Sequence, residues 1–301
     1  MIFFAIPFFK NVSFLSETIQ SLLNQSTGEW KAVVFDDSTD AQESQSAKNC
    51  VASFNHPKIS YHKNIKNVGM ANNWNQGLEA GNHDPDCIAT TILHADDRLL
   101  PEYVSEMLKQ LKQHPDATAF FCKTIVIDGN GKPVFSFTDY YKNFLLPPRQ
   151  NGLIILKGTR GIKPLIAGNF IFCPTFCFRK NKLNRIFRPD LKMVTDFELT
   201  LDLLLNDHLL IGLYEKPLFE YRRHSANTTN LMNQNLERFK EERELYRHLS
   251  TQLALKNELE LSDQSAKLLI IRKNLAFLFV TSILKGRFKL AKNYFNFIRQ
   301  L

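Results

Sequence analysis

The chain has 301 residues, of which 44% are hydrophobic and 23% charged, a composition that is typical of a folded globular protein and excludes a disordered one. The net charge is +8, but residues 267–301 alone hold eight Lys or Arg and no Asp or Glu, so the remainder is close to neutral. A broad nucleic-acid-binding surface is therefore not expected. The five cysteines lack framework spacing, which argues against a disulfide-built secreted domain, and Cys173 and Cys177 are interpreted as buried thiols.

Residues 1–100 alternate between strand and helix patterns. Short apolar runs predict strands at 2–6, 31–35, 59–61 and 88–93. Apolar side chains at helical spacing predict a helix over 15–23, the polar stretch 41–48 is expected to be helical, and a third helix over 71–80 is expected to stop at Gly81 and Asn82. This alternation predicts an α/β fold with a parallel, doubly wound sheet.

The following residues give a less regular pattern. Pro101 opens a helix that ends at His114, a strand is expected over 120–127, and Asp128–Gly131 is expected to form a hairpin turn that returns through Val134 and Phe135. Residues 138–165 are expected to form an irregular loop on the acceptor side, and a helix is expected around Phe197–Leu205. From Leu236 onward the chain is predicted to be wholly helical.

Acidic residues follow two of the predicted strands, and another begins a helix. Asp36 and Asp37 end the second strand, Asp96 and Asp97 end the fourth, and Asp196 precedes the Phe197 helix. The first two pairs share one edge of a parallel sheet, which is where such folds bind ligands. Adjacent carboxylates repel each other unless a cation lies near them, so a divalent metal carrying a phosphate is indicated.

Each acidic site also has a purely structural interpretation. Asp36, Asp37 and Asp40 fit as turn residues after a strand. Asp97 fits as the cap of the next helix, and Asp196 fits as a helix N-cap in competition with Thr195.

The order of these segments resembles the family 2 glycosyltransferases over about residues 1–230. The matching pieces are Ile6–Asn11, Ser21–Ser26, Val34–Asp40, Asn67–Gly69 with Asn75–Leu78, His94–Asp97, Thr195–Glu198 and Tyr221–Ser225. The resemblance implies the GT-A fold, a Rossmann-like nucleotide-binding sheet with helices on both faces. It also implies a nucleotide-sugar-binding half at 1–100 and an acceptor-binding half at 101–230. Beyond the part that the resemblance covers, the residues themselves predict a helical, basic and amphipathic C-terminal region at 231–301.

The resemblance also implies roles for individual residues. Pro7 and Phe9 would lie beside the donor base, Asp37 would accept its imide N–H, and Asp36 would support that turn. On the metal side, Asp96 would hold the ribose or the metal, and Asp97 would be the direct ligand of Mn²⁺ or Mg²⁺.

Further roles concern the acceptor and the leaving group. Asp196 would be the general base, with Glu198 as the alternative, because an ionised carboxylate takes the acceptor hydroxyl proton. His224 would contact the metal or the diphosphate, or else be a surface histidine. Trp74 would be a core residue or part of the acceptor wall.

Two departures from the family pattern concern the donor side. His94 occupies the place of the usual first acid, where it would be a Mn²⁺ ligand, a phosphate hydrogen-bond donor or a residue that points away. Phe8 and Lys10 replace more usual polar residues, which leaves the donor's identity open.

The implied reaction is inverting transfer of a sugar from a nucleotide-diphosphate donor, with a UDP-sugar favoured, to a hydroxyl of a glycan or lipid-linked acceptor. A nucleotidyltransferase is the first alternative, but the opening Pro7–Lys10 segment lacks the glycine-rich loop of that class. A non-catalytic basic membrane-binding protein is the second, and it leaves Asp37, Asp97 and Asp196 without a function. No nucleic-acid partner is expected.

Two segments, Met1–Ile6 and residues 267–301, bear on where the protein is expected to be located. Met1–Ile6 lacks a basic leader and is interpreted as a strand rather than a signal peptide, and no stretch reaches the roughly 18 apolar residues of a membrane span. We therefore expect a cytoplasmic protein. Residues 267–301 combine apolar and basic side chains, which suits peripheral binding to the anionic inner face of the plasma membrane. The alternatives are a hairpin packed on the catalytic domain and self-association with a second subunit.

Overall fold

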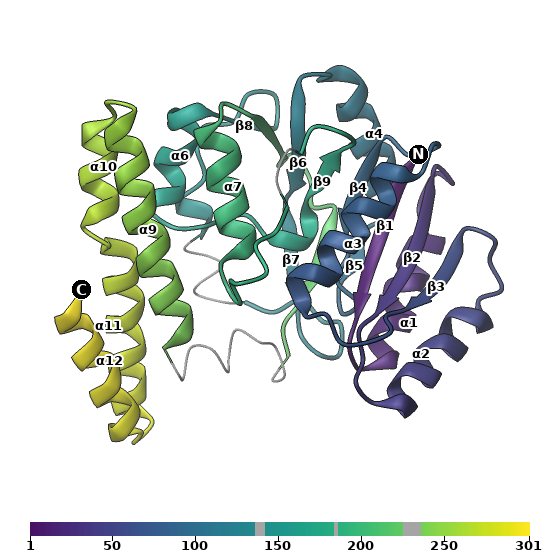
Figure 1. Ribbon diagram of the computed structural model, residues 1–301, viewed down its shortest axis with the longest axis horizontal. Coiled ribbons are helices and arrows are strands. Elements are labelled where there is room, and N and C mark those ends of the chain that lie inside the picture. Colours follow the sequence, from purple (N-terminus) through teal and green to yellow (C-terminus); the bar gives the residue numbers. More distant parts are fainter. Residues whose placement is uncertain (136–141, 184–185, 225–235) are drawn as a thin grey trace.

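The computed structural model describes residues 1–135, 142–183, 186–224 and 236–301, and its centre is an eight-stranded sheet with helices on both faces (Figure 1). In spatial order, the strands are β3 (Ile59–Lys63), β2 (Trp30–Asp36), β1 (Ile2–Phe8), β4 (Ala89–Ile92), β9 (Cys177–Arg179), β6 (Ala117–Cys122), β10 (Leu209–Leu213) and β8 (Leu153–Lys157). A second, three-stranded sheet has the order β5 (Arg98–Leu99), β11 (Phe219–Arg222) and β7 (Thr124–Ile127).

The first four strands are parallel, and helices α1 (Val12–Leu23), α2 (Ala41–Ser53) and α3 (Met70–His83) connect them. Side chains of β1 alternate between the two faces of the sheet. Phe4 and Ile6 join the core on the α1 side, whereas Phe3 and Ala5 join the core on the α3 side. This part of the prediction, a parallel sheet wound with helices on both faces, is confirmed.

The prediction that α3 stops at Gly81 is wrong, because the helix continues to His83. A Cβ atom on Gly81 would lie 2.0 Å from Oγ1 of Thr90, and one on Gly77 would lie 2.3 Å from the Cβ of Ala5. The two glycines are one helical turn apart and allow α3 to lie directly against β1 and β4. Close packing, rather than helix termination, explains Gly81.

Beyond residue 100 the sheet becomes mixed. β9 runs antiparallel to both β4 and β6 and joins the two parts, and β8 forms an antiparallel edge beside β10. The single strand expected over 120–127 is wrong, because β6 and β7 belong to different sheets. The chain changes sheet at Lys123, whose N–H donates to the Leu213 carbonyl while its carbonyl accepts from Leu218.

Two further expectations for this part need correction. The turn at Asp128–Gly131 is present, but the return forms only an isolated bridge between Pro133 and Ile127, in which the Val134 N–H donates to the Val126 carbonyl, and no strand. The expected irregular loop contains β8 and helix α6 (Gly158–Ile166), although residues 138–141 of it lie outside the described part. Both elements are short, and the elements that they pack against, β10 for β8 and α7 for α6, lie far along the sequence.

Helices cover the second part of the sheet. Helix α4 (Tyr103–Gln113) lies on the α1 side, whereas α7 (Thr195–Leu205) lies on the α3 side with α6. A short 3₁₀ helix, η1 (Cys173–Thr175), precedes β9. Nearly every residue of α7 is buried, because the sheet covers one side of this helix and the C-terminal helices cover the other.

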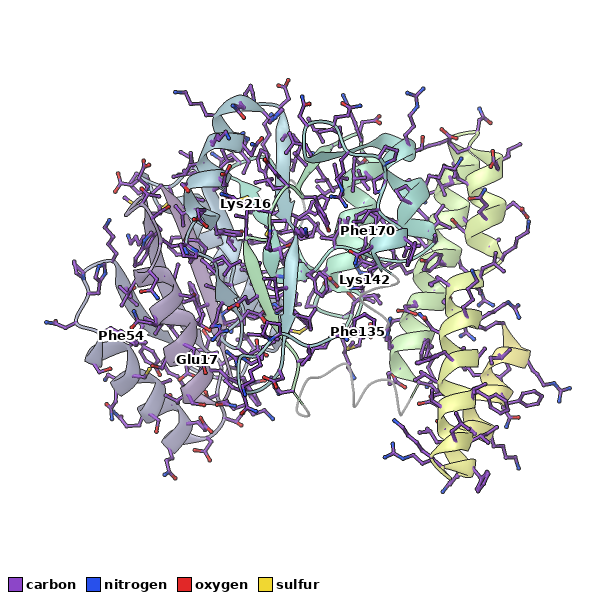
Figure 2. The ribbon with its side chains drawn as sticks, turned by 180° about the vertical axis from the view of Figure 1, so that it is seen from behind. Glu17, Phe54, Phe135, Lys142, Phe170 and Lys216 are labelled. Atoms are coloured by element: carbon purple, nitrogen blue, oxygen red, sulfur yellow. The ribbon has the colours of Figure 1, made fainter. Side chains whose placement is uncertain are left out.

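Residues 236–301 are mainly helical, as predicted, and contain α9 (Glu237–Leu255), α10 (Leu259–Ala266), α11 (Leu269–Leu284) and α12 (Phe288–Gln300), whereas residues 231–235 of the predicted region lie outside the described part. Helix α9 packs on the core, and the Tyr246 hydroxyl donates to the carbonyls of Leu165 and Ile166. Figure 2 shows from behind that Phe170 lies between the sheet and these helices. No described helix is both long and apolar enough to cross a membrane.

Candidate functional site

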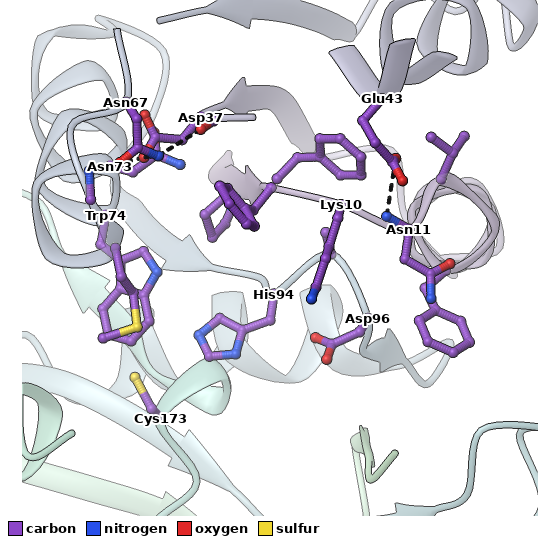
Figure 3. Close-up of a pocket in the computed structure, with 18 of the residues that line it drawn as sticks. Lys10, Asn11, Asp37, Glu43, Asn67, Asn73, Trp74, His94, Asp96 and Cys173 are labelled. Atoms are coloured by element: carbon purple, nitrogen blue, oxygen red, sulfur yellow. Dashed lines mark hydrogen bonds between the residues drawn. The ribbon is translucent and has the colours of Figure 1, made fainter. Parts of the chain in front are cut away.

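A cavity of about 1260 Å³ lies where the carboxyl ends of β1, β2 and β4 face the amino end of α7 (Figure 3). The predicted site residues that line it are Pro7, Phe9, Asp37, His94, Asp96, Asp196 and His224. Asp36 and Asp97 are 0% and 1% exposed and do not line the cavity. The structure thus brings most of the predicted residues to one cavity and leaves these two beneath its wall.

The end of β1 forms one rim of the cavity. Phe8 is buried, and its carbonyl accepts a hydrogen bond from the Asp37 N–H, which ties the ends of β1 and β2 together. Phe9 is the next residue and is 50% exposed at the cavity. Lys10 points toward the space between His94 and Asp96 in Figure 3.

Asp36 organises the turn behind this rim. Its carboxylate accepts hydrogen bonds from the hydroxyls of Ser38, Ser44 and Tyr61. Burial raises the pKa of Asp36, but these hydrogen bonds outweigh that effect, so the net shift is downward. Its place in the structure fits the expected support of the turn and not contact with a ligand.

Asp37 holds the Asn67–Gly69 loop. Its Oδ1 accepts from the Val68 N–H at 2.8 Å and from Asn64 Nδ2 at 2.9 Å, and its Oδ2 accepts from the Gly69 N–H at 2.9 Å and from Asn67 Nδ2 at 2.8 Å. Gly69 has a φ of 84°, which a side chain would strain. Four donors fill the ordinary acceptor positions of a carboxylate, so a nucleobase N–H would have to share them.

Asp97 is a buried carboxylate with one oxygen left over. Its Oδ1 accepts a hydrogen bond from the Arg222 N–H at 2.8 Å, whereas its Oδ2 is buried and has no hydrogen-bond partner in the described residues. Burial, together with the charge of Asp96, raises the pKa of Asp97 well above its usual value. The alternative role as a simple helix cap does not account for this orphaned oxygen, because buried polar atoms normally have partners.

His94 lies beside the two acids. Its ring stacks on Trp74 with the ring centres 5.1 Å apart, and its Nδ1 is 3.9 Å from Oδ2 of Asp97. Its Nε2 is buried and has no hydrogen-bond partner in the described residues, and burial lowers the pKa of the imidazole. Trp74 itself is buried and also lines the cavity, so both of its expected roles fit.

His94, Asp96 and Asp97 together form a group that fits a divalent cation. One ligand atom from each lies within 4.8 Å of the others. The orphaned Asp97 oxygen and the neutral imidazole are the kinds of donors that Mn²⁺ accepts. His224 approaches from the other side, with its Nε2 3.0 Å from Oδ2 of Asp96.

Asp196 occupies the first turn of α7 and reaches the cavity. The N-cap position of α7 belongs to Val194, and the Thr195 hydroxyl donates to the Arg188 carbonyl, so neither Thr195 nor Asp196 is the helix cap. Burial raises the pKa of Asp196, which makes its carboxylate a stronger base. Glu198, the alternative base, is 6% exposed and does not line the cavity.

Two supporting residues were not identified from the sequence. Arg222 is 0% exposed, and besides its N–H bond to Asp97, its Nε donates to the Asp96 carbonyl at 2.7 Å. Glu241 of α9 accepts hydrogen bonds from the N–H groups of Lys192, Met193 and Val194, which lead into the first turn of α7. The Tyr221–Ser225 motif pointed to the neighbourhood of Arg222, but nothing in the sequence marks Glu241.

Comparisons with known proteins agree with this architecture. The model of the family described as Glycosyl transferase family 2 matches residues 4–187. S. aureus TarS 1-349 is a similar solved structure, with 16% identity and a TM-score of 0.62, over 93% of this chain and 73% of that one. The same protein in complex with UDP has 18% identity and a TM-score of 0.62, over 94% and 74% of the two chains.

A more distant structure shares the fold. GalNAc-T7 with UDP, GalNAc and Mn²⁺ has 11% identity and a TM-score of 0.54, over 75% of this chain and 44% of that one. No curated protein matches the sequence. The structural likenesses show the GT-A fold, and the family model covers well over half of the chain. The chain therefore belongs to glycosyl transferase family 2, and the protein is a glycosyltransferase.

Proposed function

We propose that the protein transfers a sugar from a nucleoside-diphosphate donor, a UDP-sugar, to a hydroxyl of a glycan or lipid-linked acceptor, with inversion at the anomeric carbon and with Mn²⁺ or Mg²⁺. The observation that carries this proposal is the shared cavity, where the strand edge with Asp96 and the α7 end with Asp196 meet. TarS has been solved with UDP-GlcNAc and with UDP, which supports a uridine donor here. Family membership sets aside the nucleotidyltransferase and non-catalytic alternatives.

In this proposal the two halves of the chain divide the substrates. Residues 1–100 bind the donor, with Pro7 and Phe9 beside the base and Asp37 and Asp36 ordering the wall around it. Residues 101–230 bind the acceptor, and residues 231–301 support that half through contacts such as the Glu241 bonds. Phe9 supports this division because an exposed aromatic ring at the rim offers a surface for a planar base.

Asp196 acts as the general base. Its ionised carboxylate takes the proton of the acceptor hydroxyl while the acceptor oxygen forms a bond to the anomeric carbon. The bond from that carbon to the diphosphate oxygen breaks, and the nucleoside diphosphate leaves with the bonding electrons. Direct displacement of this kind inverts the configuration of the carbon.

His94, Asp96 and Asp97 would hold the divalent cation. His224 would fix the orientation of the Asp96 carboxylate through the 3.0 Å contact between its Nε2 and Oδ2 of Asp96. A divalent cation bound there stabilises negative charge on a leaving diphosphate. Arg222 keeps the two acids in place from beneath, since it contacts the side chain of Asp97 and the backbone of Asp96. Lys10 adds a positive charge at the same side of the cavity.

A nucleotide-binding screen tests the proposal. Thermal unfolding is measured with UDP, GDP and CDP, with and without Mn²⁺, for the wild-type protein, Asp97→Ala and the exposed control Asp116→Ala. We expect a Mn²⁺-dependent stabilisation by UDP that Asp97→Ala loses and Asp116→Ala keeps. A protein that responds to no nucleotide under either condition refutes the proposed function.

A further inference from the structure

The α11–α12 hairpin leaves one apolar surface uncovered. Side chains such as Ile271, Leu275 and Phe297 pack in the core, whereas seven other large side chains of the pair are 40% to 80% exposed. The exposed ones, which we call the exposed hairpin face, are Leu269, Phe277, Val280, Ile283, Leu284, Phe288 and Phe295. The five on α11 follow one another at intervals of eight, three, three and one residues, and at 100° per residue these intervals place them on one side of the helix. Exposed apolar patches of this kind mark interaction surfaces.

The charged residues of the hairpin itself are all basic. Residues 267–301 contain eight Lys or Arg and no acidic residue. Three of the basic residues, Lys285, Arg287 and Lys289, are exposed at the hairpin tip, and within the described part of the chain none of them has an ion-pair partner. A hairpin that combines exposed apolar side chains with only basic charges matches a surface that offers both acyl chains and negative headgroups.

A second copy of the chain fits this surface poorly. Two hairpins that met through their exposed faces would bring two segments of eight positive charges together, with no carboxylate from either hairpin between them. Like charges at close range destabilise such an interface. An anionic lipid surface, by contrast, attracts every one of these side chains.

The hairpin also has a suitable position relative to the cavity. In Figure 1 the tip between α11 and α12 reaches the lower side of the molecule, and the carboxyl ends of β1 and β2 point to the same side. Figure 2 shows the same placement from behind, with side chains projecting from the free sides of both helices. A surface that contacts the tip therefore lies on the side where the cavity is built.

We propose that the α11–α12 hairpin docks the protein on an anionic lipid surface. The exposed hairpin face enters the boundary between headgroups and acyl chains, and Lys285, Arg287 and Lys289 contact the negative headgroups. Docking places an acceptor carried by that surface next to the cavity, and this last step rests on the proposed glycosyl transfer.

Vesicle sedimentation of the full chain tests the docking surface. The protein is mixed with vesicles of phosphatidylcholine alone or of phosphatidylcholine with phosphatidylglycerol, and the bound fraction is titrated against lipid. We expect binding to the anionic vesicles only. Each basic side chain near such a surface contributes about fivefold, so the combined variant Lys285→Gln, Arg287→Gln, Lys289→Gln loses on the order of 100-fold in apparent affinity.

Two further variants identify the surface. Lys112→Gln, Lys157→Gln, Lys163→Gln removes the same charge from exposed positions on α4, β8 and α6, which lie on the upper side of Figure 1, and it should lose less than about fivefold. Phe277→Ser, Leu284→Ser, Phe288→Ser removes exposed apolar surface and should also weaken binding. Circular dichroism and thermal unfolding confirm that each variant is folded.

Three outcomes overturn the proposal. The wild-type protein stays unbound with anionic vesicles, or both charge variants lose affinity equally, which would mean that net charge alone acts. In the third outcome, sedimentation velocity without lipid shows a dimer that the Phe277→Ser, Leu284→Ser, Phe288→Ser variant dissociates, and vesicles are not bound. Vesicle binding is measured without nucleotide, and hydrolysis of the UDP-sugar is measured without vesicles, so the docking proposal and the proposed function can fail separately.

Discussion

On the strand side of the cavity, the Asp37 carboxylate is held by groups 27 to 32 residues away, all within the first part of the chain. On the α7 side, Glu241 binds the backbone that leads to Asp196, and the N–H groups that it accepts lie 47 to 49 residues before Glu241 in the chain. Arg222 contacts Asp97, which lies 125 residues earlier. The proposed donor side thus depends on contacts within the first part of the chain, whereas the proposed catalytic side depends on packing between distant segments. Substitutions on the two sides should therefore affect different properties, donor binding on the strand side and turnover rate on the α7 side.

The largest effect is expected from Asp196→Asn. The amide keeps the shape of the side chain but cannot take a proton, so the turnover rate should fall by about 10²- to 10⁴-fold while UDP binding stays nearly unchanged. Steady-state transfer and calorimetric UDP titration measure the two quantities. The matched control is Asp207→Asn, at an exposed position just beyond the carboxyl end of α7. Loss of UDP binding in Asp196→Asn would show that the two sides are not separate.

Arg222→Lys should weaken binding of the proposed divalent cation and leave the proposed base, Asp196, unaffected. Lysine keeps the positive charge but loses the planar group that contacts the Asp96 carbonyl and the loop carbonyls of Asp128 and Gly129. Supporting residues of this kind typically change metal affinity by about 10-fold to 100-fold. The Mn²⁺ concentration that gives half-maximal activity should rise accordingly. An unchanged Mn²⁺ requirement with a simple loss of stability would limit Arg222 to a structural role.

Glu241→Ala should have a smaller effect and lower the turnover rate more than the donor affinity. Its carboxylate accepts three backbone N–H groups before α7, and without it Asp196 is less firmly placed. We expect a loss of about 10-fold in turnover rate and about 1–3 kcal/mol in stability. Glu244→Ala, on the same helix but 60% exposed at its side chain, is the control and should change neither. Equal effects of the two substitutions would contradict this positioning role.

The smallest expected effects concern how the turnover rate and the stability depend on the protonation of Asp196. Burial raises the pKa of Asp196, so this carboxylate takes up a proton at a higher pH than an exposed aspartate does. On acidification, the turnover rate should therefore begin to fall at a pH above about 3.9, the usual pKa of an aspartate. The same raised pKa means that the ionised form costs stability, so Asp196→Asn should unfold at a higher temperature at neutral pH than the wild-type protein. A lower unfolding temperature would indicate a favourable partner for the Asp196 charge.

The sequence predicted the strand side well and the α7 side only in outline. β1, β2 and β4 are apolar runs, and acidic residues end β2 and follow β4 closely, so the existence of these strands and the positions of Asp36, Asp37, Asp96 and Asp97 follow from local patterns. β5 and β9 have only 2 and 3 residues, too few to show any periodicity. β11, which carries Arg222, pairs with β5 and β7, and this second sheet separates β7 from β6 at Lys123. The role of Gly81 was missed for the same reason, since its neighbour Thr90 lies on another element.

The central claim is that a donor held on the strand side is attacked from the Asp196 side, and the configuration of the product tests it most directly. Proton NMR identifies the anomer that forms first when the enzyme turns over an α-linked UDP-sugar in the presence of Mn²⁺. The account predicts the β-anomer, with the signal strongly reduced in Asp196→Asn. An α-anomer as the first product would contradict it.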